Sequence, residues 1–162
     1  MEKKIKAAGY IRVSTLAQVK EGESIDTQRK SIEAFVKKEN IELVQIYADE
    51  GISGGSVRNR HGLLQCLKDG LNGKFSVIII YRLSRFGRNA LELLNNYKEL
   101  QRAGIQLRSI SEGIDFSTFY QAESDEGPMP EAVITIVFTA LIGETMRLLK
   151  NPMFMIMMML DM

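Results

Sequence analysis

The sequence predicts an α/β fold: a mostly parallel sheet flanked by helices, followed by a long C-terminal helix. Short apolar, β-rich segments alternate with segments of helical periodicity, which is typical of parallel sheets with helices on both faces. The length of 162 residues suits one domain of ordinary size. A content of 45% hydrophobic and 25% charged residues is that of a globular protein.

Four segments are predicted strands: residues 6–13, 42–48, 75–81 and 105–110. The first two are rich in apolar and β-branched side chains, and the second alternates in polarity. The third contains the run Val-Ile-Ile-Ile and is the most apolar, so we expect it near the centre of the sheet. Because the active site of such a sheet lies beyond the carboxyl ends of its strands, the residues after each strand are of most interest.

Helices are predicted at residues 24–40, 62–72, 89–103 and 130–150. Ser24 and Asn89 are plausible N-caps, and Gly104 ends the third helix. The expected apolar faces of the first three carry Ile25, Ile32, Phe35 and Val36; Leu63, Leu64, Leu67 and Leu71; and Leu91, Leu94, Tyr97 and Leu100.

We divide the chain into a catalytic α/β domain over residues 1–128, a long helix over 129–150 that serves oligomerisation, and an atypical methionine-rich tail over 151–162. Residues 111–128 form a long polar connection, a kind of segment that is often functional. Pro152 should end the last helix.

The composition excludes several classes of function. Cys66 is the single cysteine, so there is no internal disulfide framework, and His61 is the single histidine, so a histidine-rich metal site is impossible. We expect no metal and no cofactor, since P-loop and dinucleotide-binding patterns are absent. No signal peptide or membrane span is visible, and a cytoplasmic setting is expected. Cys66 is expected to be a buried packing residue and His61 a surface or capping residue.

Charge is distributed unevenly, although the net charge is only +1. Between residues 54 and 90, Asp69 is the only acid against Arg58, Arg60, Lys68, Lys74, Arg82, Arg85 and Arg88. A local basic cluster indicates either an anionic ligand or a solvated surface.

Ser14 ends the first predicted strand, two residues after Arg12. Strand alternation puts both side chains on one face. A serine in this place most often starts a turn, but an arginine on a sheet face buries a charge unless an anion or a carboxylate meets it. Tyr10, on the same strand, is expected to be a packing residue.

Three arginines, Arg82, Arg85 and Arg88, follow the third strand at a spacing of three, where the next helix begins. A helix N-terminus favours anions, and the arginine fork matches phosphate oxygens. The alternative is a basic surface rim.

Together these segments resemble the serine site-specific recombinases of the resolvase/invertase type, over roughly residues 5–150. The matching motifs are Tyr-x-Arg-Val-Ser-Thr at 10–15, Gln28, Asp-x-Gly-x-Ser-Gly at 49–54, Arg-x-Gly-Leu at 60–63, Arg-x-Gly-Arg at 85–88, Gly-Ile at 104–105, Glu-Gly-Ile-Asp at 112–115 and Glu144. The first 60 residues are closer to the large integrase and transposon members.

The resemblance implies a DNA-cleaving enzyme in which Ser14 attacks a phosphodiester and forms a 5′-phosphoseryl bond, without metal or cofactor. It implies that Arg12, Arg85 and Arg88 are the other catalytic residues. Supporting positions would be Gln28, Asp49, Arg60 and Ser84, with a possible DNA contact at Arg82. The partners implied are DNA and further copies of the chain, in dimers that pair into a tetramer through Phe138, Leu141 and Glu144. The general base is left unassigned.

Two departures from the family pattern stand out. Ser84 occupies a position where the family usually has aspartate, on the register that aligns Arg85 and Arg88 with its Arg-x-Gly-Arg motif; the alternative register uses Arg82 and Arg85. Glu144 is followed by Thr145 instead of the frequent arginine. We also expect that the C-terminal DNA-binding module of the family is absent from this chain.

Two other classes of function remain open at this point. One is a non-catalytic DNA-binding or regulatory module on the same fold. The other is an unrelated flavodoxin-like phosphate-binding domain, for which bound yellow flavin would be the sign.

Overall fold

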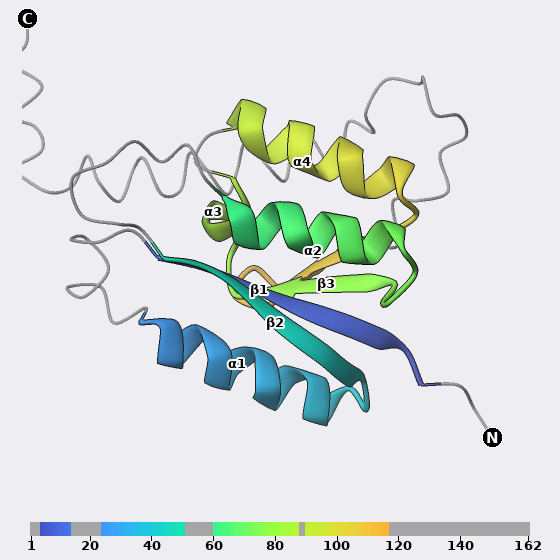
Figure 1. Cartoon of the computed structure of the whole chain (residues 1–162). Coiled ribbons are helices and arrows are strands. Elements are labelled where there is room, and N and C mark those ends of the chain that lie inside the picture. The colour runs from blue at the N-terminus through green and yellow to red at the C-terminus, as the bar shows by residue number, and fades with distance from the viewer. Residues whose placement is uncertain (1–3, 14–23, 51–59, 88–89, 117–162) are drawn as a thin grey trace, which may run out of the picture.

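The structure is a computed structural model that describes residues 4–13, 24–50, 60–87 and 90–116. Ser14 and Arg88, the predicted helix over 130–150 and the methionine-rich tail lie outside the described residues. Figure 1 draws the described residues in colour.

A five-stranded sheet forms the middle layer, with the strand order β2-β1-β3-β4-β5. Its strands are β1 (Lys6–Val13), β2 (Glu42–Glu50), β3 (Val77–Ile80), β4 (Gln106–Ser109) and β5 (Ile114–Asp115). The first four run parallel, and β5 pairs antiparallel with β4. The prediction of a mostly parallel sheet is thus confirmed, and β3 is its central strand as expected, whereas β5 falls in the segment expected to be a polar connection.

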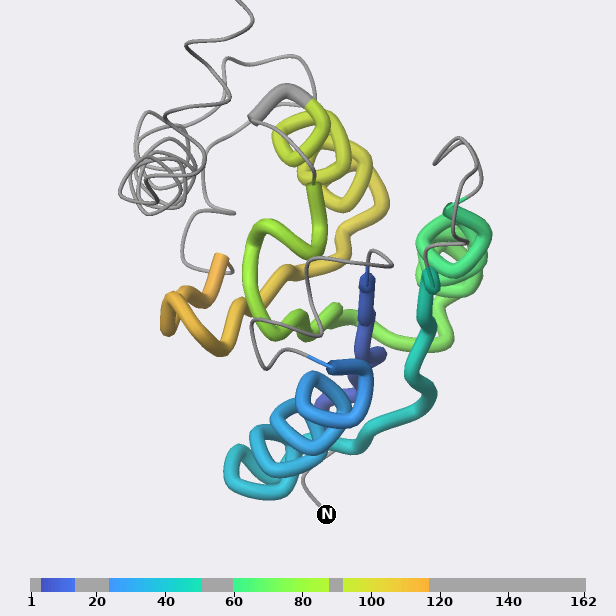
Figure 2. Tube along the Cα trace, turned by 90° about the vertical axis from the view of Figure 1, so that its left-hand side faces the viewer, coloured from blue at the N-terminus to red at the C-terminus, as the bar shows by residue number. Residues whose placement is uncertain are grey.

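Helices cover both faces of this sheet, as predicted. They are α1 (Ile25–Lys38), α2 (His61–Leu71), α3 (Leu83–Phe86) and α4 (Ala90–Arg102). Figures 1 and 2 show α1 on one side of the sheet and α2 and α4 on the other. The chain therefore forms three layers, with one apolar core on each side of the sheet.

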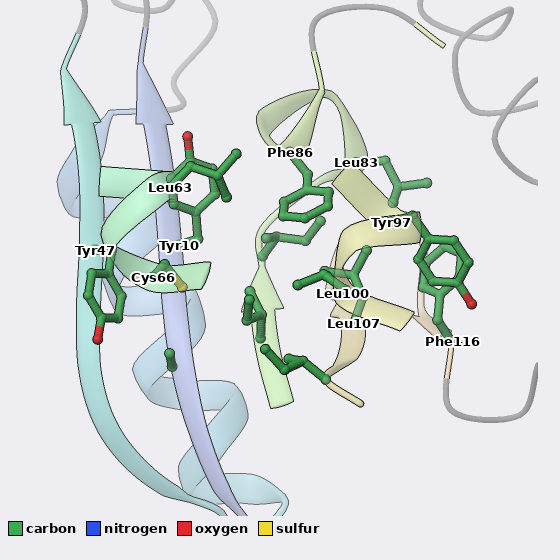
Figure 3. Close-up of a cluster of buried hydrophobic side chains, with 14 of the residues drawn as sticks. Tyr10, Tyr47, Leu63, Cys66, Leu83, Phe86, Tyr97, Leu100, Leu107 and Phe116 are labelled. Carbon is green, nitrogen blue, oxygen red and sulfur yellow. The ribbon is translucent and has the colours of Figure 1, made fainter. Parts of the chain in front are cut away.

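Strand alternation feeds the two cores. On β1, Ala8 and Tyr10 face α2 and α4, whereas Ala7 and Ile11 face α1. All four residues of β3 are buried and divide between the cores in the same way. Figure 3 shows the larger core, where Phe86, Tyr97, Leu100 and Leu107 pack together. A parallel strand covered on both faces must be apolar throughout, which explains the Val-Ile-Ile-Ile run.

The first helix agrees closely with its prediction. Ser24 caps α1, because its Oγ accepts a hydrogen bond from the Thr27 amide at 3.1 Å. Ile32 and Val36 are buried, and Ile25 and Phe35 pack partly buried against the same core. The helix ends at Lys38, and Asn40 then adopts φ 53°, a left-handed conformation that asparagine tolerates.

The predicted apolar face of α2 is wrong in part. Leu63 is buried and Leu67 partly so, but Leu64 is 62% exposed and Leu71 is 67% exposed. The inward face instead runs through Leu63, Cys66 and Gly70. Small residues lie here because the helix packs close to its neighbours: a Cβ at position 70 would lie 2.3 Å from the Ile105 side chain. Cys66 is a buried packing residue and His61 is exposed, both as predicted.

The short helix α3 was not predicted. Its four residues follow β3 within the segment that carries Arg82 and Arg85, before the helix expected from residue 89. Leu83 and Phe86 anchor it in the core. One helical turn is too short to leave a periodic pattern in the sequence.

Candidate active site

The predicted site residues gather at the carboxyl ends of β1 and β2, where α3 crosses after β3. Arg12 is the last but one residue of β1 and pairs in register with Asp49 of β2. Arg60 directly precedes α2, and Ser84 and Arg85 lie within α3. The contacts below show how these elements are tied together.

Asp49 caps α2 from the end of β2. Its two carboxylate oxygens accept hydrogen bonds from the amides of Gly62 at 2.7 Å and Leu63 at 3.0 Å. Glycine is required at position 62, since a Cβ there would lie 2.5 Å from the carbonyl oxygen of Ala48. A carboxylate at a helix N-terminus is favourable because of the unpaired amides and the helix dipole. Asp49 also accepts a hydrogen bond from the Tyr10 hydroxyl at 2.9 Å.

Arg60 connects four elements. Its Nη2 donates to the Tyr10 hydroxyl at 2.9 Å and to the carbonyl oxygens of Phe86 at 2.9 Å and Arg85 at 3.3 Å. Its Nη1 pairs with the Glu92 carboxylate of α4 at 2.6 Å. The Arg60 side chain is only 10% exposed. Its guanidinium is thus committed to contacts within the protein.

Arg12 reaches from β1 to the backbone of α3. Its Nη2 donates to the carbonyl oxygen of Ser84 at 2.6 Å, and its Nε donates to that of Arg85 at 3.2 Å. Burial lowers the pKa of the Arg12 guanidinium, and the positive charges of Arg60 and Arg85 lower it further. Its hydrogen-bond partners within the described residues are thus the two backbone carbonyls of α3.

The Arg85 carbonyl is where the two arginine forks meet, since Arg12 and Arg60 both donate to it. Arg85 itself is only 6% exposed. Arg82 lies over the Tyr81 ring, 5.8 Å from its centre. Ser84 has its Oγ buried without a hydrogen-bond partner in the described part of the chain.

Gln28 of α1 is fully buried, and its Nε2 donates to the carbonyl oxygen of Arg12 at 3.2 Å. The helix on the other face of the sheet therefore holds the backbone at the end of β1. This contact gives a physical account of the predicted supporting position.

Tyr10 does more than the packing role that the sequence indicated. It is fully buried, as a packing residue should be, but its hydroxyl joins Asp49 to Arg60. Burial raises the pKa of this hydroxyl, and Arg60 opposes that rise. A lone tyrosine on a strand carries no sign of such a role.

Three further side chains were not predicted as site residues: Glu92, Asn96 and Glu112. Asn96 of α4 donates to the carbonyl oxygen of Phe86 at 2.8 Å, and Glu112 accepts from the amide of Leu83. Glu112 was visible in the Glu-Gly-Ile-Asp motif. The two residues of α4 have no local signal, because their role depends on where the helix packs.

Other predicted positions cannot be placed. Ser14, Arg88, Phe138, Leu141 and Glu144 lie outside the described residues. Within the described residues, no group of three or more His, Cys, Asp and Glu side chains is placed to hold a metal ion. No described helix is long and apolar enough to cross a membrane.

Comparison with known proteins identifies the family. Residues 7–125 match the family model for the resolvase N-terminal domain. A resolvase/recombinase from Pseudomonas putida is 32% identical over 143 residues, which cover 88% of this chain and 67% of that protein. Transposon Tn3 resolvase from Escherichia coli is 30% identical over 146 residues, covering 88% of this chain and 65% of that protein. The chain thus spans about two thirds of the length of these relatives.

The fold agrees with the same assignment. The crystal structure of a resolvase family site-specific recombinase from Streptococcus pneumoniae is similar to this structure, with a TM-score of 0.66 and 28% sequence identity. The match covers 98% of this chain and 100% of that one. The family model covers more than half of the chain, and both the relatives and this structural neighbour are recombinases. The chain therefore belongs to the resolvase N-terminal domain family of recombinase enzymes.

Proposed function

We propose that this chain is the catalytic part of an enzyme for site-specific DNA recombination, with Ser14 as the nucleophile. Family membership argues against an unrelated flavodoxin-like phosphate-binding domain. It leaves a non-catalytic module on the same fold as the competitor, and Ser14 with its arginines distinguishes the two.

One observation carries the proposal: at the carboxyl end of β1, two arginine side chains bond the backbone carbonyls at and around Arg85. Arg12 and Arg60 both donate to the Arg85 carbonyl, and Ser14 follows Val13, the last residue of β1, in the chain. Preorganised positive groups beside a nucleophile are what phosphoryl transfer requires.

The proposed reaction is a transesterification. The Ser14 Oγ forms a bond to phosphorus while the bond from phosphorus to the 3′ oxygen breaks. The serine gives up its proton to a base that we leave unassigned, and the departing 3′ oxygen gains one. The product is a 5′-phosphoseryl bond and a free 3′-hydroxyl, and attack by another 3′-hydroxyl reverses the step.

Arginine suits the charge that spreads over the phosphoryl oxygens in the transition state, since its guanidinium stays protonated. Arg85 and Arg88 are the proposed phosphate ligands, with the charge of Arg12 beside them. Loss of one such donor typically costs on the order of 10²–10³ in rate. Arg60 acts differently: its hydrogen bonds to the Arg85 and Phe86 carbonyls support a positioning role.

Recombination between two duplexes requires four strand cuts, so four nucleophiles must act. We propose dimers that pair into a tetramer, with the helix predicted at 130–150 as the contact surface around Phe138, Leu141 and Glu144. That segment carries more apolar residues than one buried stripe needs, which supports a partner helix.

The test is covalent capture. The full-length protein is incubated with sheared genomic DNA of its source organism, denatured in detergent, and any DNA still attached is sequenced. We expect DNA joined through its 5′ end to Ser14, at a recurrent site. Oligonucleotides with that captured site and a nick beside it then serve as suicide substrates for rate measurements.

Ser14→Ala should abolish the adduct while leaving the fold intact. The matched control is Ser31→Ala, which removes a serine of α1 that bonds the Thr27 carbonyl at 2.8 Å and should leave the adduct unchanged. A Ser14→Ala protein that still joins DNA would exclude Ser14 as nucleophile. A wild-type protein that binds DNA but forms no adduct would favour the non-catalytic module.

A further inference from the structure

The short helix α3 depends on side chains from other elements at both of its ends. Within the helix, the Gly87 amide bonds the Leu83 carbonyl at 3.2 Å and the Arg85 amide bonds the Arg82 carbonyl at 3.0 Å. A single helical turn is not stable by itself, since nucleation costs more than one or two hydrogen bonds return. The position of Arg85 therefore rests on what holds this turn.

The carbonyl side of α3 is held by three side chains that donate to it. Arg12 bonds the carbonyls of Ser84 and Arg85, and Arg60 bonds those of Arg85 and Phe86. Asn96 adds a second bond to the Phe86 carbonyl. These donors satisfy groups that a helix leaves unpaired at its C-terminus.

The amide side of α3 is held by Glu112. Its two oxygens lie 3.2 and 3.3 Å from the Leu83 amide nitrogen. A negative charge is favourable at this end of a helix. The Ser109 hydroxyl bonds the same carboxylate and so orients it.

Glu112 is itself on a fixed support. It lies in the turn between β4 and β5, where the amides of Ile110 and Ser111 bond the carbonyls of Ile80 at 3.0 Å and Tyr81 at 2.8 Å. The turn is thereby joined to the chain that leaves β3 and leads into α3. Glu112 thus bonds the first amide of α3 from a turn that is itself hydrogen-bonded to the end of β3 and to Tyr81.

We propose that Glu112 is a positioning residue for strand cleavage, which sets the place of Arg85 through the backbone of α3. This inference rests on the proposed function. Arg85 lies two residues after Leu83, so a shift of the first amide moves the backbone that carries its guanidinium. Glu112 acts on the rate of the chemical step and has little effect on DNA affinity, because it does not touch the phosphate.

The experiment measures adduct formation on the captured suicide site with full-length wild-type protein, Glu112→Ala and Glu112→Gln. For each protein we measure the thermal midpoint of unfolding. Well below that midpoint, we then measure the first-order rate at saturating DNA and the half-saturating DNA concentration. The matched control is Glu99→Gln, which changes a carboxylate that is 57% exposed and paired with Arg102 on the outside of α4.

We expect Glu112→Ala to slow the first-order rate by on the order of 10-fold to 100-fold, since a misplacement of about 1 Å can cost about 10²-fold. Half-saturation should stay within about two-fold, because phosphate contacts dominate affinity. Glu112→Gln keeps an acceptor oxygen for the Leu83 amide but loses the negative charge, so it should slow the rate by only a few-fold. Glu99→Gln should match the wild type.

A Glu112→Ala protein that folds, is less stable, and still cleaves at the wild-type rate would overturn the inference, since its role would be structural only. Should that variant fail to fold, Glu112→Gln decides: a rate a few-fold below wild type supports the inference, and an unchanged rate overturns it. If the wild type forms no adduct, the proposed function fails and the inference fails with it. If the wild type forms the adduct and the Glu112 variants form it at the same rate, the inference alone fails.

Discussion

Two tyrosine–aspartate pairs lie side by side in this domain and differ in what they are attached to. Tyr10 and Tyr47 are partners in register on β1 and β2, and both are buried. Tyr10 donates to Asp49 at 2.9 Å, and Tyr47 donates to Asp69 at 2.6 Å. Figure 3 shows their hydroxyls pointing to opposite ends of the sheet, that of Tyr10 toward the carboxyl ends of the strands.

Each pair also includes a cation, and here the two ends diverge. At the carboxyl end, Arg60 is 10% exposed and bonds Tyr10, Glu92 and two carbonyls of α3. At the other end, Lys74 is 53% exposed and bonds Asp69 at 2.8 Å. The first network joins four elements around the proposed phosphate ligands. The second fastens α2 to the chain that enters β3.

A buried tyrosine–aspartate pair is therefore not, by its chemical groups alone, evidence of a functional site. Both pairs contain the same groups at hydrogen-bond distance and both tyrosines have raised pKa values. What distinguishes them is the end of the sheet at which they lie and the backbone that the cation reaches. Variants of the two cations and of the two tyrosines test this distinction.

The first prediction compares the two cations. Arg60→Ala should lower the free energy of unfolding by about 3 kcal/mol, because it removes a 10% exposed guanidinium together with its ion pair to Glu92 and its hydrogen bonds to Tyr10 and to two carbonyls of α3. Lys74→Ala should cost less, since the lysine is half exposed and the Asp69 carboxylate keeps its hydrogen bonds from Tyr47 and Gln65. Urea denaturation of both variants measures the difference. Equal losses would mean that the two ends are built alike.

The second prediction compares the two hydroxyls. Tyr10→Phe should cost about 1–3 kcal/mol of stability, since it removes two buried hydrogen bonds to charged groups, one to Asp49 and one from Arg60. DNA cleavage should survive better than in Arg60→Ala, because the bonds from Arg60 to the Arg85 and Phe86 carbonyls remain. Tyr47→Phe should lower stability without any effect on the cleavage rate below the unfolding transition. A cleavage rate that falls equally in both tyrosine variants would break the comparison.

The sequence was sufficient to predict most of the fold, and the reason is local. Residues 6–13 were predicted as a strand and form β1 with the same limits. An apolar stretch of this length, bounded by polar residues, is typical of a buried strand and is short for a buried helix. The cap at Ser24 and the buried positions Ile32 and Val36 of α1 follow from equally local rules.

What could not be predicted depends on contacts between distant segments. Leu64 and Leu71 of α2 face outward although they are apolar, since Cys66 and Gly70 fit more closely against the core. The helix α3 is held by hydrogen bonds from Arg12 and Arg60 and to Glu112. These residues are distant in the chain: Arg12 and Ser84 are separated by 72 positions.

The same holds for the candidate site. The motifs predicted that Arg12 and Arg85 lie together at the carboxyl end of the sheet, and the two do meet there, but the motifs gave no sign that Arg12 would bond the backbone carbonyls of α3. Glu92 and Asn96 were missed because only the packing of α4 brings them to Arg60 and Phe86. Motifs therefore predicted which residues to inspect, whereas the contacts that hold those residues in place became visible only in the structure.

The third prediction, the smallest in effect, concerns high pH. Burial raises the pKa of Tyr10, with Arg60 in opposition, and burial together with the hydrogen bond to Asp69 raises that of Tyr47. A tyrosine in the unfolded chain loses its proton near pH 10, while the folded protein still holds it. The folded state then binds more protons, so stability is fully present below about pH 10 and falls as the pH rises above it.

Each tyrosine can contribute a slope of up to about 1.4 kcal/mol per pH unit to this fall. Tyr10→Phe and Tyr47→Phe should each flatten the decline measured by urea denaturation between about pH 10 and pH 11.5, and the double variant should flatten it by the sum, since each proton is counted separately in the linkage relation. The two ends of the sheet should thus behave alike in this one property, because burial is the leading cause at both. A slope that changes with one tyrosine only would show that the other already ionises in the folded protein, and its hydrogen bond to aspartate would then need another proton donor.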